Sequence, residues 1–138
     1  MQDPLITQLC NFAEENKDID VIWLYGSRAR NTYNETSDYD LAIAFKHFIT
    51  EPLDSKLRPE LLALDWQKSL SEIPHLMTKS TVKLSIIDIN KSPIALAYTI
   101  IIDDHPFYIN DAMRKLQEEN RIMSRWELDY EYSRKTYA

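Results

Sequence analysis

The sequence reads VIWLYGSRAR over residues 21–30 and SDYDLAIAF over residues 37–45. Residues 19–25 are mostly apolar and β-branched or aromatic, which predicts a buried strand. Gly26 is the only glycine of the chain and follows this strand directly. A lone glycine at such a position indicates a sharp turn or a close approach of the backbone to another group. Residues 39–45 predict a second strand, in which Tyr39, Leu41, Ile43 and Phe45 face the core.

Two aspartates open this second strand. Asp38 and Asp40 are two residues apart, so their side chains point to the same face. Paired carboxylates repel each other unless a cation neutralises them, and Mg²⁺ prefers one or two carboxylates together with water and phosphate oxygens. The backbone N–H groups and the Ser27 hydroxyl at the preceding turn suit phosphate oxygens. An Asp-x-Asp or a Gly-Ser alone is common, but their combination predicts a site for a nucleoside triphosphate and one or two Mg²⁺ ions.

Residues 21–45 resemble the signature of the DNA polymerase β nucleotidyltransferase superfamily. The Ser-Arg-Ala-Arg sequence after Gly26, the Ser-Asp-Tyr-Asp-Leu sequence at 37–41 and the length of 138 residues resemble its minimal nucleotidyltransferase (MNT) branch. The resemblance extends more loosely to about residue 108. It implies an α/β (α+β) fold with a small mixed sheet covered by helices, in one domain over residues 1–138 with a core at about 19–108.

The resemblance also implies a function. Members of the MNT branch often serve as cytoplasmic antitoxins that transfer AMP from ATP to a tyrosine of a HEPN-domain ribonuclease toxin. On this basis Asp38, Asp40 and Ser27 are the expected catalytic residues, and Asp38 and Asp40 the expected Mg²⁺ ligands. Gly26, Ser27 and Arg28 are the expected nucleotide-binding residues. Arg28 or Arg30 either adds positive charge near the leaving group or is a solvated helix residue.

A third strand, expected over residues 81–89, bears on the number of acidic ligands, because relatives usually carry a third carboxylate there. Alternation places Asp88 on the core side with Val82, Leu84 and Ile86, and places Lys83, Ser85 and Ile87 on an opposite, open face. Matching Asp88 to the relatives' second aspartate puts Ser85 where the third carboxylate is usual. We therefore favour two acidic ligands, while a β-bulge would bring Asp88 into the site.

The remaining segments predict helices. Asp3 can cap a helix that begins at Pro4, with an apolar stripe of Leu5, Leu9, Phe12 and Ala13. Further helices are expected near 59–72, after Ser92-Pro93, and over about 110–134 with Asn110 as its cap. In the helix expected near 59–72, the side chains expected to cover the sheet are Leu61, Leu62, Leu64, Trp66 and Leu70. In the last helix, Tyr130, Tyr132 and Tyr137 are candidates for a partner surface.

Composition restricts the class of protein. The net charge is −6 and the pI about 5.0, which argues against tight non-specific nucleic-acid binding and suits a basic protein partner. No segment has the roughly 20 apolar residues that cross a bilayer. Cys10 is the only cysteine, which fits a reducing, cytoplasmic compartment. The histidines His47, His75 and His105 show no metal-ligand spacing.

Three interpretations stay open from the sequence. The first is the protein adenylyltransferase antitoxin described above. The second is an antitoxin that occludes its partner by binding alone, with a weak or vestigial nucleotide site, and the missing third aspartate favours it. The third is a small-molecule nucleotidyltransferase of the aminoglycoside-modifying kind. Such enzymes usually carry an additional helical domain, for which this chain has little room.

Overall fold

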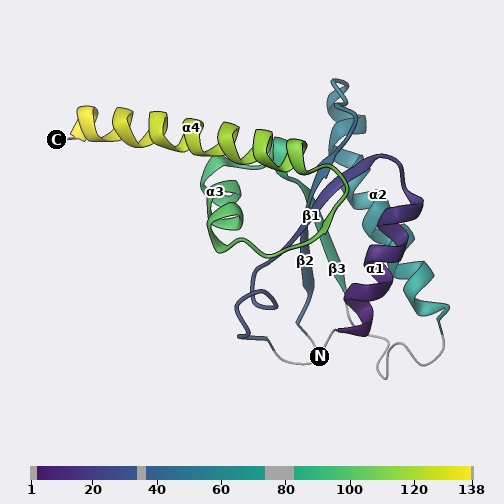
Figure 1. The fold of residues 1–138 in the computed structure, drawn as a ribbon. Helices are drawn as coiled ribbons and strands as arrows, with labels where there is room; N and C mark the ends of the chain where they lie inside the picture. The colour runs from purple at the N-terminus through teal and green to yellow at the C-terminus, as the bar shows by residue number, and fades with distance from the viewer. Residues whose placement is uncertain (1–2, 34–36, 74–82, 138) are drawn as a thin grey trace.

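The computed structural model describes residues 3–33, 37–73 and 83–137. A four-stranded mixed sheet with the order β3-β2-β1-β4 forms its centre (Figure 1). Strand β1 (Ile19–Tyr25) pairs antiparallel with both β2 (Tyr39–Phe45) and β4 (Pro106–Ile109). Strand β3 (Leu84–Asp88) pairs parallel with β2. The predicted α+β fold class is therefore confirmed.

The sequence predicted β1 and β2 with the bounds that the structure shows. In the third predicted strand, residues 81 and 82 lie outside the described part of the chain, and β3 ends at Asp88, where a 3-10 helix (Ile89–Lys91) follows. The fourth strand was missed. It has only four residues, begins with a proline and lies at the sheet edge, so it shows no alternation from which a strand could be predicted.

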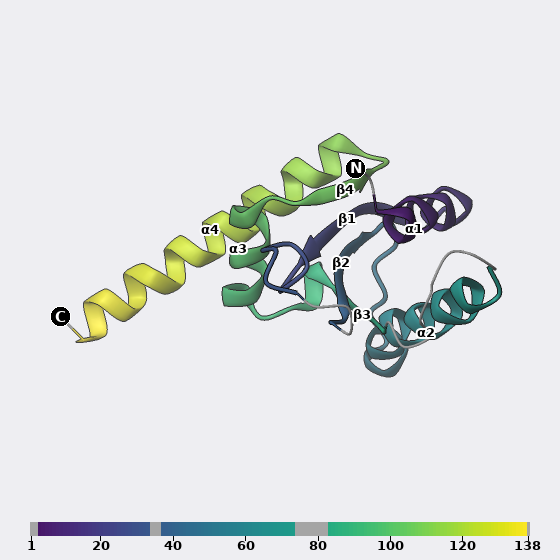
Figure 2. The ribbon, with the colours of Figure 1, turned by 90° about the horizontal axis from the view of Figure 1, so that it is seen from below.

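Two helices cover one face of the sheet. Helix α1 (Pro4–Glu15) begins as predicted, because the Asp3 carboxylate accepts a hydrogen bond of 2.9 Å from the Leu5 N–H. Its predicted stripe packs against the inward-facing side chains of β2. Helix α2 (Pro52–Ser71) lies beside α1 on the same face (Figure 2), and the ring of Trp66 is 5.9 Å from that of Phe12.

Helix α2 differs from the prediction in two ways. It begins at Pro52, a favoured first position, and continues through Pro59, whereas the sequence placed its start near residue 59. Pro59 is buried against the sheet side of the helix. Leu61 and Leu64 are exposed, contrary to the expectation that they cover the sheet, because the buried positions of this helix are Pro59, Ala63, Trp66 and Leu70.

Helices α3 (Ile94–Asp103) and α4 (Ala112–Tyr137) cover the other face. They pack on Val21, Trp23, Ala42 and Ala44, all fully buried, through Ala97, Ile100 and Ile122. The face that the sequence analysis described as open is therefore a second core over most of its length, and Ile87 packs against it. At one end of the strands, Asp38 is exposed and Asp40 and Ser85 are partly buried.

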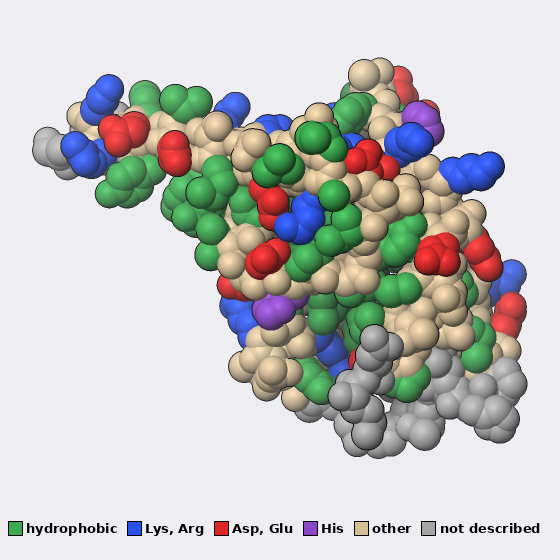
Figure 3. Space-filling model, viewed as in Figure 1, with side chains coloured by type: hydrophobic (Ala, Val, Ile, Leu, Met, Phe, Trp, Pro, Cys, Tyr) green, Lys and Arg blue, Asp and Glu red, His purple; other side chains and the backbone are tan. Residues whose placement is uncertain are grey.

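The cap of α4 is Asp111 and not the predicted Asn110, since the Asp111 carboxylate accepts a 3.0 Å hydrogen bond from the Arg114 N–H. Buried Arg114 fastens the start of α4 to the sheet, donating to the Phe45 carbonyl at 2.7 Å and to Glu118 at 2.9 Å. The end of α4 projects beyond the body of the protein (Figure 3). Tyr130 and Tyr132 are exposed there, and the Tyr137 side chain lies outside the described residues. None of the described helices has the length and apolarity needed to span a membrane.

Candidate active site at the Gly26 turn

The closest approach in the predicted site is between Gly26 and Asp40. Gly26 has a φ of +73°, a left-handed conformation that glycine adopts without strain. A Cβ atom at this position would lie 3.3 Å from the carboxyl carbon of Asp40 and closer still to its Oδ2 atom. The β1–β2 register explains this, because Tyr25 pairs with Asp40. The single glycine therefore makes room for an aspartate side chain.

The carboxylates of Asp38 and Asp40 are close enough for their negative charges to repel each other. Burial, and then the charge of Asp38, raise the pKa of Asp40 above its ordinary value. Asp38 is exposed and Asp40 is partly buried. Within residues 3–33, 37–73 and 83–137, no Lys or Arg side chain forms an ion pair with either carboxylate. The arrangement concentrates negative charge at one end of the sheet and fits a divalent cation.

Ser27 belongs to a tight turn over residues 26–31. The Arg30 N–H donates to the Gly26 carbonyl at 3.3 Å, and the Thr32 N–H donates to the Ser27 carbonyl at 3.1 Å. Asn31 closes the turn with a φ of 58°. The segment is therefore a closed turn, and the alternative that Arg28 and Arg30 are residues of a helix is not what the structure shows.

Arg28 lies inside the loop that joins β1 to β2. Its guanidinium carbon is 4.4 Å from the ring centre of Tyr33 and 4.1 Å from that of Tyr39. Its Nη2 atom donates to the Ser37 carbonyl at 3.0 Å. The Tyr39 hydroxyl in turn donates to Asp3, the cap of α1, and burial is the main reason that the pKa of Tyr39 is raised. Arg28 thus holds the backbone directly before Asp38.

Replacing Arg28 tests this positioning role. We expect Arg28→Met to lower the free energy of unfolding by about 2 kcal/mol, because the Ser37 carbonyl and two aromatic rings lose a charged partner. We also expect weaker binding of Mg·ATP in calorimetry, since the backbone before Asp38 is no longer held. Arg30→Met is the matched control. Its expected effect on stability is below about 1 kcal/mol, because Arg30 forms only a surface ion pair, with 3.2 Å between its Nη2 atom and Oδ2 of Asp103. Equal stability losses in both variants would contradict this role.

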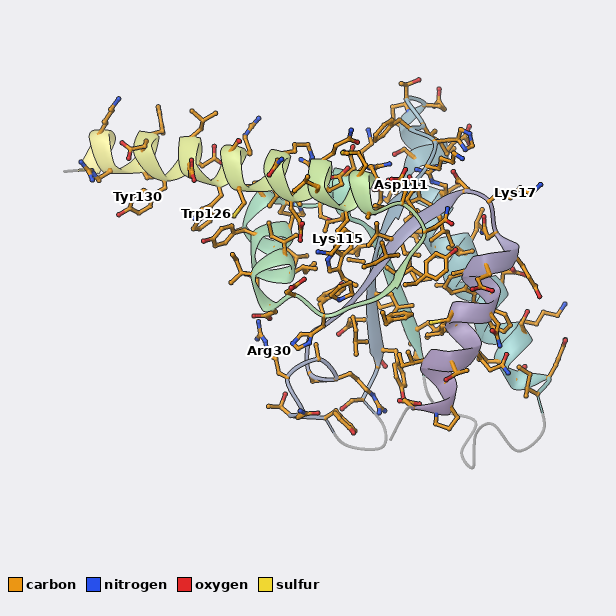
Figure 4. All side chains as sticks on the ribbon, in the orientation of Figure 1. Lys17, Arg30, Asp111, Lys115, Trp126 and Tyr130 are labelled. Atoms are coloured by element: carbon orange, nitrogen blue, oxygen red, sulfur yellow. The ribbon has the colours of Figure 1, made fainter. Side chains whose placement is uncertain are left out.

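Arg30 connects the turn to the helix layer. Its guanidinium pairs with Asp103 at the end of α3, and Figure 4 shows the side chain reaching from the turn toward that helix. Tyr25 precedes the turn, and burial together with the charge of Asp40 raises its pKa to about 12. The sequence analysis did not predict Tyr25 to be near the site. Its position directly before Gly26 in the sequence was the signal that could have indicated this.

The third strand places Ser85 beside the aspartates and Asp88 away from them. Ser85 pairs with Asp40, whereas Asp88 pairs with Ile43 further along β2. Asp88 is buried, with its carboxylate 3.3 Å from an Arg58 nitrogen. Burial raises the pKa of Asp88, although Arg58 opposes this shift. In the part of the chain that the structure describes, no three His, Cys, Asp or Glu side chains gather around one point.

The fold is that of a nucleotidyltransferase. A family model described as Polymerase beta, Nucleotidyltransferase matches residues 7–113, which is more than half of the 138 residues. The chain therefore belongs to the polymerase beta nucleotidyltransferase family. A comparison of the sequence with curated proteins finds no significant match.

Solved structures with a similar fold come from toxin–antitoxin complexes. A chain of a toxin–antitoxin crystal structure with AMP-PNP has a TM-score of 0.67 and 14% identity, over 99% of this chain and 94% of that one. A chain of the MntA–HepT complex has a TM-score of 0.64 and 12% identity, over 98% and 94%. A chain of the tri-AMPylated Shewanella oneidensis HEPN toxin in complex with MNT antitoxin has a TM-score of 0.65 and 12% identity, over 99% and 94%. At these identities the likeness shows the fold.

Proposed function

We propose that this chain is a single minimal nucleotidyltransferase domain that acts as a cytoplasmic antitoxin, transferring AMP from ATP to a tyrosine of a HEPN-domain toxin. The observation that carries the proposal is the contact between the Gly26 turn and Asp40, next to Asp38. Membership of the polymerase beta family supports the transfer of a nucleotide. The toxin–antitoxin structures with a similar fold support the identity of the partner, and an AMPylated toxin among them supports the reaction.

In this proposal the Gly26–Ser27 turn binds the phosphates of ATP, and Asp38 and Asp40 are the residues that would hold Mg²⁺. The fit to a cation rests on two neighbouring carboxylates that have no cationic partner among the described side chains. When bound, Mg²⁺ would neutralise charge on the triphosphate and lower the pKa of the attacking hydroxyl. The chain's own contribution is to position the reacting groups.

The transfer forms a bond between the phenol oxygen of the acceptor and the α-phosphorus of ATP. The bond from the α-phosphorus to the bridging oxygen breaks, pyrophosphate leaves with the electron pair, and the phenol proton passes to solvent. Ser85, which stands beside Asp40, is a poor general base. A tyrosine acceptor suits such a site because its pKa of about 10 is far below that of an alkyl alcohol.

Intact-mass spectrometry tests the proposal. The protein is incubated with ATP, Mg²⁺ and a HEPN-domain toxin, and the partner is expected to gain one or more AMP masses. The gain is expected to disappear with Asp38→Ala/Asp40→Ala protein. Wild-type protein that leaves the partner's mass unchanged would overturn the transfer.

The second candidate is an antitoxin that neutralises its partner by occlusion alone. Ser85 beside Asp40, where relatives usually carry a carboxylate, is the observation that favours it. In that case the partner is neutralised without a mass gain, and Asp38→Ala/Asp40→Ala protein neutralises it equally well. The same experiment therefore separates the two candidates.

A further inference from the structure

The outer surface of α2 carries a line of leucines, which we call the leucine ridge: Leu53, Leu57, Leu61 and Leu64. Their spacing of four, four and three residues places them on one side of the helix. The buried side chains of α2 lie on the opposite side, so the ridge faces solvent except at Leu57, which is partly buried. Leu53, Leu61 and Leu64 are 61%, 58% and 63% exposed. Figure 2 shows α2 at the edge of the molecule, next to the outermost strand β3.

One end of the leucine ridge borders a cavity that Asp38 and Ser85 of the candidate site also line. The cavity has a volume of about 420 Å³ and lies between α2 and β3, the last strand at this side of the sheet. Its lining includes Glu60, Leu64 and Gln67 from α2, and Asp38, Lys83 and Ser85 from the strand ends. Leu64 therefore lines the same cavity as Asp38, one of the two residues that would hold the cation.

We propose that the leucine ridge is the surface on which the acceptor protein docks, with an apolar segment along Leu61 and Leu64 and its acceptor phenol in this cavity beside Asp38. The inference rests on the proposed function. The argument is one of continuity, because a protein that presents a side chain to Asp38 through this cavity must cover the ridge at its rim. Exposed apolar patches of this kind mark protein-interaction sites, and the cavity lies in the size range of ligand pockets.

The lining of the cavity suits a phenol more than a phosphate. Leu64 and the edge of β3 supply apolar surface for the ring. The side-chain oxygen of Gln67 already accepts a hydrogen bond of 2.7 Å from the Leu84 N–H. Glu60 and Asp38 outnumber Lys83, so the lining has a net negative charge that is unfavourable for an anion. The triphosphate is left to the Gly26 turn, so nucleotide and acceptor approach the carboxylate pair from different sides.

The test compares the double variant Leu61→Gln/Leu64→Gln with the matched control Met113→Gln/Leu116→Gln. Met113 and Leu116 are 61% and 50% exposed on α4 and have the same spacing of three residues, so the same change is made on a comparable helix surface away from Tyr130 and Tyr132. Both variants are expected to fold, because none of the four side chains is in a core. Calorimetry with ATP and Mg²⁺ is expected to give wild-type affinity for both, because the changes add no charge beside Asp38. Binding to a HEPN-domain toxin is expected to fall by about 10-fold or more in the ridge variant only.

Wild-type binding by the ridge variant would overturn the proposal, as would an equal loss in the Met113→Gln/Leu116→Gln control. A wild-type dimer that the ridge variant converts to a monomer, with partner binding unchanged, would assign the ridge to a second copy of this chain and also overturn it. Ridge-dependent binding without any gain of AMP mass would support the docking surface while contradicting the transfer reaction. The failure of the inference and the failure of the proposed function are thus distinguishable.

Discussion

Asp40→Asn protein is expected to lose AMP transfer by more than about 100-fold while becoming more stable than the wild type. Mutation of a residue that only hydrogen-bonds to a metal ligand typically lowers metal affinity or activity by about 10- to 100-fold. Removing the charge of a proposed ligand itself is therefore expected to lower activity further. The gain in stability has a separate cause. Ionised Asp40 is partly buried beside Asp38, and this raises its pKa, so the folded protein bears an electrostatic cost that asparagine removes.

The pH dependence of this gain follows from the raised pKa of Asp40. The pKa of Asp40 is higher in the folded state than in the unfolded state, so protonation of this carboxyl stabilises the folded protein. That stabilisation is lost as the pH rises through the pKa of the folded state. The melting temperature of Asp40→Asn should therefore exceed that of the wild type at neutral pH, and the difference should shrink on acidification. Asp65→Asn, an exposed change on α2, is the control and should alter neither property. An Asp40→Asn protein less stable than the wild type at neutral pH would contradict this account.

Gly26→Ala is expected to lower the free energy of unfolding by about 3 kcal/mol and to abolish measurable binding of Mg·ATP. Part of the loss comes from the left-handed backbone, which costs a residue with a side chain about 1–2 kcal/mol. The rest comes from the new methyl group, which would overlap the Asp40 carboxylate and displace it. Chemical denaturation and calorimetry measure the two effects.

A double-mutant cycle separates the two causes. In an Asp40→Ala background the carboxylate is absent, so Gly26→Ala should cost only the backbone part of the loss. A cost that is the same in both backgrounds would mean that the methyl group does not meet Asp40. The cycle therefore measures the approach between turn and strand that positions the candidate site.

Much of the scaffold could be predicted because its signals are local. Alternation along residues 39–45 identified the inward-facing side chains of β2, and the Asp3-Pro4 pair located the start of α1. Strand β4 and the start of α2 could not be predicted in this way. A four-residue edge strand depends on its neighbour for its existence, and a proline within a helix is tolerated when the surrounding structure packs around it.

The sequence by itself determined that a strand, a lone glycine with a serine, and a strand opening with two aspartates follow one another, because strand periodicity and turn chemistry act over a few residues. Only the tertiary structure decided what these residues meet. It set the Asp40 carboxylate against Gly26, placed Arg28 between Tyr33 and Tyr39, and turned Asp88 toward Arg58. It also left Leu61 and Leu64 in solvent. Apart from the contact of Arg28 with Tyr33, the contacts named here join different segments of the chain, which strand register and helix packing bring together.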